Sequence, residues 1–351
     1  MSKEIFAAIE QIEKTKGIPQ EVLKEAVEAA LLSAYRKNFR SSHKGVSVTL
    51  NPQDGTIKVF ARKTVVDKLR DSATEILEEE AKRLGFDAQV GDVVEIEVTP
   101  QDFGRIAAQT AKQVIIQRIK EAERDLIYEE FVEREGEIIT GIISKREGNN
   151  VIVDLGKTDA LLPFSEQTST ENYRIGERMK FYIVEVKKTS KGSRIVLSRT
   201  HPGLVRRLFE LEVPEVHDGL VDIRAIAREP GVRSKVIVES RSDNVDPVGS
   251  CIGNRGSRVK NITDELRGEK IDIIKWSNDP RALIAESLSP ARVIRVELDE
   301  ETNTARVFVP EDQVSLAIGK DGQNARLTAR VTGWRIDINR EENGGQKENT
   351  D

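Results

Sequence analysis

The sequence predicts a multi-domain α+β protein. A chain of 351 residues is long enough for two to four domains. Short strand-like runs follow one another over residues 131–200, and residues 201–340 contain an internal repeat. We therefore expect five parts: an N-terminal α/β domain with a long connector helix (1–130), a five-stranded barrel (131–200), a first repeat (201–277), a second repeat (278–340) and a disordered tail (341–351).

Composition excludes several classes of protein. The sequence has no run of about 18 apolar residues, which a membrane-spanning helix requires. Its first residues also lack the apolar core of a signal peptide. One cysteine cannot form an intrachain disulfide, and three scattered histidines make no zinc-ligand cluster. We expect a cytoplasmic protein without membrane contact. Because the net charge is −5, any surface that binds anions must be local.

Helical spacing and breaker residues define the expected elements of the N-terminal domain. Gly17 ends a first helix, and Pro19 begins a second whose apolar residues lead to Tyr35. A long helix begins at about Phe103, with apolar residues three and four positions apart. Between these helices we expect strands at 46–50 and 56–66 joined by a turn at 51–55, an acidic helix at 75–84 that stops at Gly85, and a strand at 93–98.

From Gly136 onward the pattern changes to short strands separated by glycine-containing turns. Five short strands within about 70 residues suggest a small closed barrel, and the OB-fold is the commonest barrel of this size. The expected strands are 137–143, 150–155, 159–162, 180–187 and 193–198.

The internal repeat is the most informative feature of the sequence. Four residues recur 66 positions later: Val248, Ile252, Gly253 and Gly256 correspond to Val314, Ile318, Gly319 and Gly322. Each copy has the order helix, strand, strand, short helix, G-x-x-G, helix, strand. Expected strands are 220–227, 235–239 and 271–273 in the first copy, and 293–298, 305–309 and 336–338 in the second.

The two G-x-x-G pairs gain their meaning from this repeated context. The glycine content alone predicts between one and two such pairs by chance. Here, however, each pair ends one apolar helix and opens another, which resembles a type II KH domain (αββααβ) that binds a single-stranded backbone. Glycine has no Cβ, so a phosphate can approach the main chain and the free N–H groups of the next helix. The alternative is a helical hairpin whose glycines only make the turn.

Candidate RNA-binding residues follow from this resemblance. Arg255 and Lys320 are placed to meet phosphates, whereas the charge of Asp321 opposes phosphate binding. Apolar residues such as Val248 and Ile252 form the expected floor of a groove for unstacked bases. The candidates are Gly253, Asn254, Arg255, Gly256 and Arg258 in the first repeat, and Gly319, Lys320, Asp321, Gly322 and Asn324 in the second.

The barrel resembles the S1 motif, an OB-fold RNA-binding module. The matching stretches are 136–141 (GEIITG), 153–156 (VDLG), 161–166 (LLPFSE) and 194–198 (RIVLS). Where S1 motifs often have stacking aromatic residues this chain has Asn149 and Ile152, and Pro163 replaces a usual histidine. Each stacked base contributes roughly 1–3 kcal/mol. We therefore expect weak RNA binding, mostly through Lys187, Lys188, Lys191 and Arg194, or a barrel with a purely structural role.

The order of an α/β domain, one barrel and two repeats resembles the NusA family of bacterial transcription elongation factors. Characteristic stretches are 102–114 (DFGRIAAQTAKQV), 248–253 (VGSCIG) and 316–327 (LAIGKDGQNARL). The resemblance covers residues 1–340 and implies pausing, intrinsic termination and antitermination as processes. It implies a monomer with three kinds of partner. The N-terminal domain is expected to bind RNA polymerase, and the other partners are single-stranded nascent RNA and further antitermination factors. The acidic C-terminal repeats of some members are absent.

No pattern in the sequence indicates catalysis, a cofactor or a metal. Adjacent carboxylates at 78–80 point in different directions on a helix, and Cys251 fits packing beneath the glycine loop better than redox chemistry. Trp276 and Trp334 fit either base stacking or packing. An exoribonuclease-associated RNA-processing protein is the alternative, although there the KH unit usually precedes S1. A ribosome-associated structural protein is a third possibility.

Overall fold

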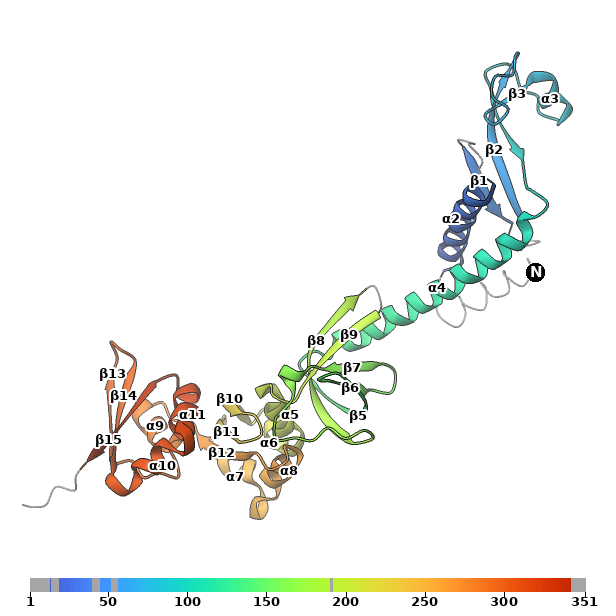
Figure 1. The fold of residues 1–351 in the computed structure, drawn as a ribbon. Coiled ribbons are helices and arrows are strands. Elements are labelled where there is room, and N and C mark those ends of the chain that lie inside the picture. Colours follow the sequence, from blue (N-terminus) through green and yellow to red (C-terminus); the bar gives the residue numbers. More distant parts are fainter. Residues whose placement is uncertain (1–12, 14–18, 40–44, 52–55, 190–191, 342–351) are drawn as a thin grey trace, which may run out of the picture. The chain divides into compact units, whose positions relative to one another are not determined.

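The computed structural model describes residue 13 and residues 19–39, 45–51, 56–189 and 192–341. These residues divide into two compact units, 1–127 and 128–351. The predicted α+β class is confirmed by helices and sheets in both units (Figure 1). None of the helices in this described part has the length and apolar character needed to span a membrane. The first helix, the turn at 52–55 and the tail after Glu341 lie outside the described residues.

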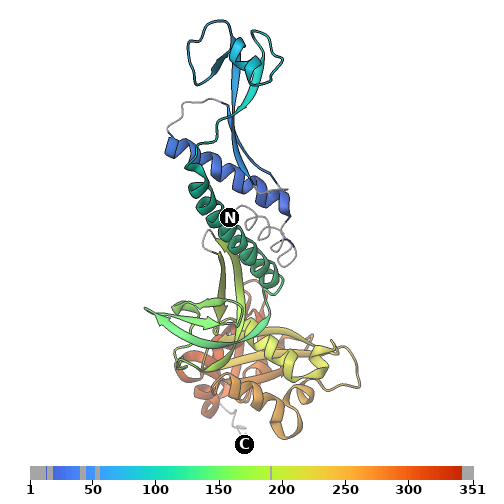
Figure 2. The same ribbon diagram turned by 90° about the vertical axis from the view of Figure 1, so that its right-hand side faces the viewer.

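The first unit has a core between two helices and a β-hairpin. Helix α2 (Gln20–Phe39) and the start of α4 (Phe103–Val132) pack against β1 (Val46–Leu50) and β2 (Ile57–Val66), as Figure 2 shows. The buried side chains of α2 are four residues apart, at Leu23, Val27, Leu31 and Tyr35. This spacing places them on one face of the helix and explains the apolar pattern of the sequence.

Strand β2 extends beyond this core into a second, smaller cluster. There it pairs in parallel with β3 (Glu75–Leu77) and antiparallel with β4 (Val93–Glu97), and α3 (Glu78–Arg83) follows β3 directly. The expectation of one acidic helix over 75–84 is therefore wrong for its first turn. Ile76 is 3% exposed and packs with Val65 and Val94, so burial in the sheet outweighs local helix propensity.

The second unit begins with the predicted five-stranded barrel. Its closed strand order is β5-β6-β7-β9-β8, with β7 and β9 parallel and all other pairs antiparallel. The strands alternate inward apolar and outward polar residues, as expected for a small barrel with a filled interior. Their bounds are β5 Ile138–Glu147, β6 Asn150–Asp154, β7 Asp159–Leu162, β8 Arg178–Thr189 and β9 Gly192–Ser198.

Both repeats have the predicted αββααβ order. The first contains α5 (Pro202–Glu212), the short α6 (Pro214–His217), β10 (Val221–Glu229), β11 (Arg233–Ser240), α7 (Pro247–Ile252), α8 (Ser257–Glu265) and β12 (Lys270–Lys275). The second contains α9 (Pro280–Ser287), β13 (Arg295–Asp299), β14 (Thr304–Pro310), α10 (Val314–Ile318), α11 (Gln323–Thr332) and β15 (Arg335–Glu341). In each sheet the middle strand pairs antiparallel with the first and parallel with the last.

The second repeat docks on the outer sheet face of the first. Apolar residues of β10, β11 and β12 form a buried cluster with α9 and α11: Ala227, Ile237, Ile274, Leu283, Leu327 and Val331. At its edge, Glu229 accepts hydrogen bonds from Gln323 (2.5 Å) and Arg326 (2.7 Å to Nε). Burial alone would raise the pKa of Glu229, but these bonds and the charges of Arg326 and Arg330 lower it. The two repeats therefore share a core.

Candidate nucleic-acid interface

The two glycine loops have the same backbone conformation. We call residues 253–256 the first loop and residues 319–322 the second loop. The φ and ψ angles are 74° and 176° at Gly253 and 76° and 171° at Gly319. The residues before the second glycines, Arg255 (φ 52°) and Asp321 (φ 54°), are left-handed although neither is glycine. Such a conformation costs roughly 1–2 kcal/mol, so both loops retain a strained turn.

The first glycine of each loop is packed tightly against its own repeat. A Cβ added at Gly253 would lie 2.6 Å from Cγ of Arg258, and one added at Gly319 would lie 2.8 Å from Cβ of Asn324. The second glycines differ, because nothing lies within 4 Å of such an atom at Gly322, and only a Val259 methyl reaches 4.0 Å at Gly256. Among the described residues, therefore, the open approach to the main chain is at the second glycine.

Each loop leads into a helix with an uncapped N-terminus. Gly256 and Gly322 are the N-cap residues of α8 and α11, and within the described chain neither helix has a side-chain cap hydrogen bond. The N–H groups of Ser257 and Gln323 already donate to the carbonyl oxygens of Asn254 and Lys320, so it is the positive end of the helix dipole that favours an anion at such a position. The side chains of Asn254, Arg255, Lys320 and Asp321 are all exposed beside these helix ends.

Two of the predicted contact residues have structural roles. Asn324 is 3% exposed and its Nδ2 donates to the carbonyl oxygens of Leu288 and Leu316, so its side chain does not face a strand of RNA. Nη1 of Arg258 donates to the carbonyl oxygen of Ser250 (2.6 Å) and to Glu215 (2.8 Å). Both side chains fill the space beside the first glycine, so the expectation of an exposed side chain is wrong for Asn324, whereas an RNA contact by Arg258, whose side chain is 29% exposed, stays a prediction.

Apolar side chains lie next to the loops. Ile252 and Ile318, which directly precede the two loops, are 38% and 40% exposed, and Leu316 is 43% exposed. Val248 is half-buried against the core of the first repeat. An exposed apolar surface beside an anion-binding helix end suits unstacked bases.

Lys260 is a candidate that the sequence reasoning missed. It is exposed on α8, four residues after Gly256, and no ion pair involves it among the described residues. The corresponding residue of the second repeat, Arg326, instead binds Glu229 of the first repeat. The 66-residue shift could have identified Lys260 as a candidate, because it aligns Lys260 of the first repeat with Arg326 of the second.

The basic residues of the barrel lie on the β8–β9 hairpin. Lys187 is opposite Arg194 and forms an ion pair with Glu185 (2.5 Å), whereas Lys188 is opposite Ser193. Lys191 lies outside the described residues. The opposite end of β8, at Lys180 and Tyr182, contacts the first repeat. The structure therefore does not bring these cations together with the glycine loops.

A buried arginine joins the barrel to the first repeat. Arg199 is completely buried and donates to Glu171, to Glu265 of α8 (3.2 Å) and to the carbonyl oxygen of Lys180 (2.7 Å). Burial alone would lower the pKa of Arg199, but the hydrogen bond and charge of Glu171 and the charge of Glu265 raise it. Burial raises the pKa of Tyr173, whose hydroxyl donates to Glu171. Removing one partner of such a buried pair typically costs about 3–5 kcal/mol.

The barrel also fits closely against the β10–β11 hairpin of the first repeat. Gly231 lies in the turn of this hairpin with φ 75°, and a Cβ added there would lie 2.0 Å from Oγ1 of Thr170. Within the first repeat, Nη1 of Arg228 beside the turn donates to the carbonyl oxygen of His201 (2.8 Å), the residue that follows the barrel. The barrel and the first repeat therefore meet over a polar, tightly fitted junction.

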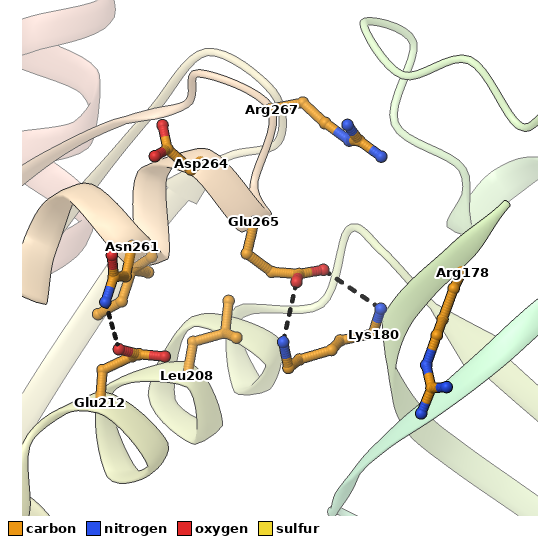
Figure 3. Close-up of a pocket in the computed structure, with 9 residues that line it drawn as sticks. Arg178, Lys180, Leu208, Glu212, Asn261, Asp264, Glu265 and Arg267 are labelled. Atoms are coloured by element: carbon orange, nitrogen blue, oxygen red, sulfur yellow. Dashed lines mark hydrogen bonds and ion pairs between the residues drawn. The ribbon is translucent and has the colours of Figure 1, made fainter.

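A cavity of about 390 Å³ opens at this junction (Figure 3). Its charged lining residues are balanced, with Arg178, Lys180 and Arg267 against Glu212, Asp264 and Glu265. Figure 3 shows Glu265 accepting hydrogen bonds from the backbone N–H and the ammonium group of Lys180. Because its lining has no excess positive charge, the cavity does not attract phosphate, and we regard it as part of the junction.

The remaining candidates are packed in the fold or, for Glu78, paired on its surface. Cys251 is buried in the core of the first repeat, and burial raises its pKa to about 12. Trp276 lies half-buried beside the shared core of the repeats, and Trp334 packs in the second repeat. The carboxylate of Glu78 pairs with Lys82. Over the described ranges, no group of three or more His, Cys, Asp or Glu residues could hold a metal ion.

Profiles of four sequence families match consecutive parts of the chain. They are the NusA N-terminal domain (residues 4–125), the S1 RNA binding domain (133–199), the NusA-like first KH domain (199–276) and the NusA-like second KH domain (280–346). Their order is the order of the parts described above.

Three curated proteins, each named transcription termination/antitermination protein NusA, are similar over nearly the whole chain. The protein of Halalkalibacterium halodurans is 54% identical over 97% of this chain and 89% of its own length. The Bacillus subtilis protein is 54% identical over 97% of this chain and 92% of its own length. The Thermus thermophilus protein is 42% identical over 96% of this chain and 89% of its own length. This chain belongs to the NusA family of transcription termination/antitermination proteins.

Proposed function

We propose that the protein binds single-stranded nascent RNA through its two glycine loops while its N-terminal unit binds RNA polymerase. As a NusA family member it is a non-enzymatic, RNA-binding protein of transcription termination and antitermination. The exoribonuclease-associated alternative is therefore not retained. We further propose that it acts as a monomer in the cytoplasm and works with other antitermination factors.

The matched geometry of the two loops carries the RNA-binding proposal. Two loops with the same strained backbone each present an open second glycine, an uncapped helix end and exposed polar side chains. A turn with no ligand would not need a left-handed non-glycine residue in both copies, since glycine would relieve the strain. Strained backbone repeated at equivalent positions supports a shared binding role.

The modest charge of the chain fits an RNA binder that is tethered to polymerase. A net charge of −5 disfavours tight non-specific binding, which is driven mainly by phosphate contacts. A tether converts weak RNA binding into an intramolecular event at high effective concentration. The protein would then act on the transcript of its own polymerase and release bulk RNA.

Replacing the loop residues by acidic ones tests the RNA-binding proposal. We expect the combined variant Asn254→Asp, Arg255→Asp and Lys320→Asp to lose RNA binding while its unfolding midpoint stays within a few degrees, because negative charge enters both loops. Arg306→Asp is the control, since it lies exposed on the outer sheet face of the second repeat. Electrophoretic mobility shift with single-stranded RNA provides the measurement. Unchanged affinity of the loop variant would remove the proposal.

The polymerase proposal is tested separately by the two halves of the chain. Residues 1–130, which contain the first compact unit, are expected to retain RNA polymerase on an affinity column without RNA. Retention by residues 131–340 alone would reverse the roles of the halves. A transcription time course with the full chain, scoring pause lifetimes and terminator readthrough, then links both activities.

A further inference from the structure

Phe164 is the most exposed aromatic side chain of the barrel, whereas Tyr182 is half-buried and stacks on His201. Phe164 is 66% exposed, and it is the only aromatic residue among the exposed large hydrophobic residues of the described chain. The barrel rings of Phe181 and Tyr173 are 0% and 4% exposed. A single exposed apolar residue needs no explanation by itself. The surroundings of Phe164, however, hold it in this position.

The turn that contains Phe164 is braced on both sides. It is a 3-10 turn (Phe164–Glu166) that follows β7 directly. The Phe164 N–H donates to Oδ1 of Asn150 (3.2 Å), and Nε2 of Gln167 donates to the carbonyl oxygen of Asn149 (2.8 Å). On the other side, the Arg199 N–H donates to the carbonyl oxygen of Glu166 (2.9 Å). These bonds fix the backbone while the ring stays in solvent.

This turn lies at the face on which OB-folds bind oligonucleotides. That face consists of the second and third strands, the loop between the first two strands and the loop between the last two. In this barrel the first three of those elements are β6, β7 and the loop at 148–149, and the Phe164 turn is hydrogen-bonded to this loop. The positions where S1 motifs often carry rings hold Asn149, the buried Ile152 and Pro163 instead. Phe164 follows Pro163 directly, and its ring is exposed.

A chain of contacts connects the Phe164 turn to the second loop. Thr168, just beyond the turn, lies 2.5 Å from the Cβ position of Gly231 in the β10–β11 hairpin. Glu229 in the same hairpin binds Gln323 and Arg326 of α11, the helix that begins at the second loop. The barrel, the first repeat and the helix that follows the second loop are therefore in continuous contact.

We propose that Phe164 is a stacking platform for one base of single-stranded RNA. The proposal rests on the proposed RNA-binding function and assigns to the barrel a contact of a different kind from the expected cations. A ring fixed in place before binding loses little conformational freedom when a base stacks on it. Because stacking is sequence-tolerant, the site takes any base and does not select a sequence.

Four single variants of the full chain test this proposal by titration with a fluorescently labelled single-stranded RNA. We expect Phe164→Ala to weaken binding about 5- to 100-fold, the loss typical of one stacked base. Phe164→Leu is expected to lose nearly as much, and Phe164→Tyr to stay within about twofold. Ile175→Ala is the matched control, because Ile175 is an equally exposed apolar residue of the barrel at 70%. It should leave affinity unchanged.

The salt dependence of binding separates this contact from the phosphate contacts. A stacked neutral base releases no counterions, so Phe164→Ala should shift the log–log salt plot downward with the same slope, whereas the loop variant should flatten it. Unchanged affinity of Phe164→Ala, full affinity of Phe164→Leu, or a loss confined to polymerase binding would each overturn the stacking proposal alone. If the unaltered chain bound no RNA, the proposed function would fall with it.

Discussion

The two repeats share one loop geometry but differ in what covers their sheets. Backbone angles at equivalent loop positions agree within a few degrees. The outer sheet face of the first repeat, in contrast, is buried beneath α9 and α11, whereas Arg295, Arg306 and Arg335 on that of the second are exposed. The loop is thus the constant feature, and the sheet face is where the copies have diverged.

Side-chain size at the edge strands accounts for this divergence. In register, Ala225 and Ala227 of the first repeat correspond to Arg295 and Glu297 of the second. The small alanines leave room for the helices of the second repeat to approach the sheet. In the second repeat, the Arg295 guanidinium lies 3.6 Å from the ring centroid of Phe308 and also pairs with Glu297 and Glu341. A charged cover of this kind discourages a further domain from stacking there.

The largest effect is expected from placing a charge at the equivalent central position of each sheet. Ile237→Asp should lower the free energy of unfolding by about 3 kcal/mol or more, because Ile237 is completely buried between the repeats. Phe308→Asp should cost about 1 kcal/mol, because half-buried Phe308 is already next to solvent. Urea unfolding followed by the fluorescence of Trp276, beside the shared core, measures both. Equal losses of unfolding free energy would show that the covered sheet face of the first repeat and the exposed sheet face of the second do not differ in their contribution to stability.

A smaller effect is expected from making the second loop resemble the first. Asp321→Arg reproduces the position of Arg255 and replaces a negative charge by a positive one. We expect several-fold tighter RNA binding and a steeper salt dependence, by about one phosphate contact. The reciprocal change Arg255→Asp should weaken binding and flatten the salt plot. If Asp321→Arg weakened RNA binding and Arg255→Asp strengthened it, the residue before the second glycine would not face the phosphates.

The smallest effect concerns pH at the edge of the docked face. The pKa of Glu229 is lowered in the folded protein, so its stabilising contribution is complete above its ordinary value of 4.5 and is lost as pH falls through the lowered pKa. Docking should therefore loosen below about pH 4.5, which is measured as faster proteolysis at residues 276–279. Glu229→Gln should remove most of this acid dependence.

Asp299, at the corresponding strand end of the second repeat, provides the control for this pH effect. Its pKa is lowered by hydrogen bonds from Thr302, and no α11 equivalent docks against it among the described residues. Asp299→Asn should leave the proteolysis profile unchanged. A change of similar size in both variants would trace the acid effect to general destabilisation.

The sequence predicts most elements because their patterns are local or repeated. The barrel strands follow from polar–apolar alternation, and the repeats follow from the 66-residue shift. Strand β3 was missed because a three-residue strand is defined by its pairing with β2 and not by its own composition. The apolar spacing of three and four residues predicted the start of α4 at about Phe103, where the structure has it.

The docking of the repeats could not be predicted, because both middle strands are apolar on both faces. Val236, Ile237 and Val238 correspond to Val307, Phe308 and Val309, and only the neighbouring strands show which face is covered. The burial of Asn324 was equally hidden. Its contact with Gly319 depends on the left-handed turn between them, which a motif does not reveal. The exposure of Phe164, likewise, is set by bonds from distant segments.

The tightly fitted junction between the barrel and the first repeat, at Arg199 and Gly231, has a consequence for the proposed RNA binding. Arg199 is bonded to two carboxylates and there is no room for a Cβ at Gly231, so a tilt of the barrel on the first repeat would break these contacts. If RNA binds to the barrel and the first repeat as proposed, the barrel side and the repeat side of the binding surface are joined before the RNA arrives, and the RNA is the partner that must change its conformation.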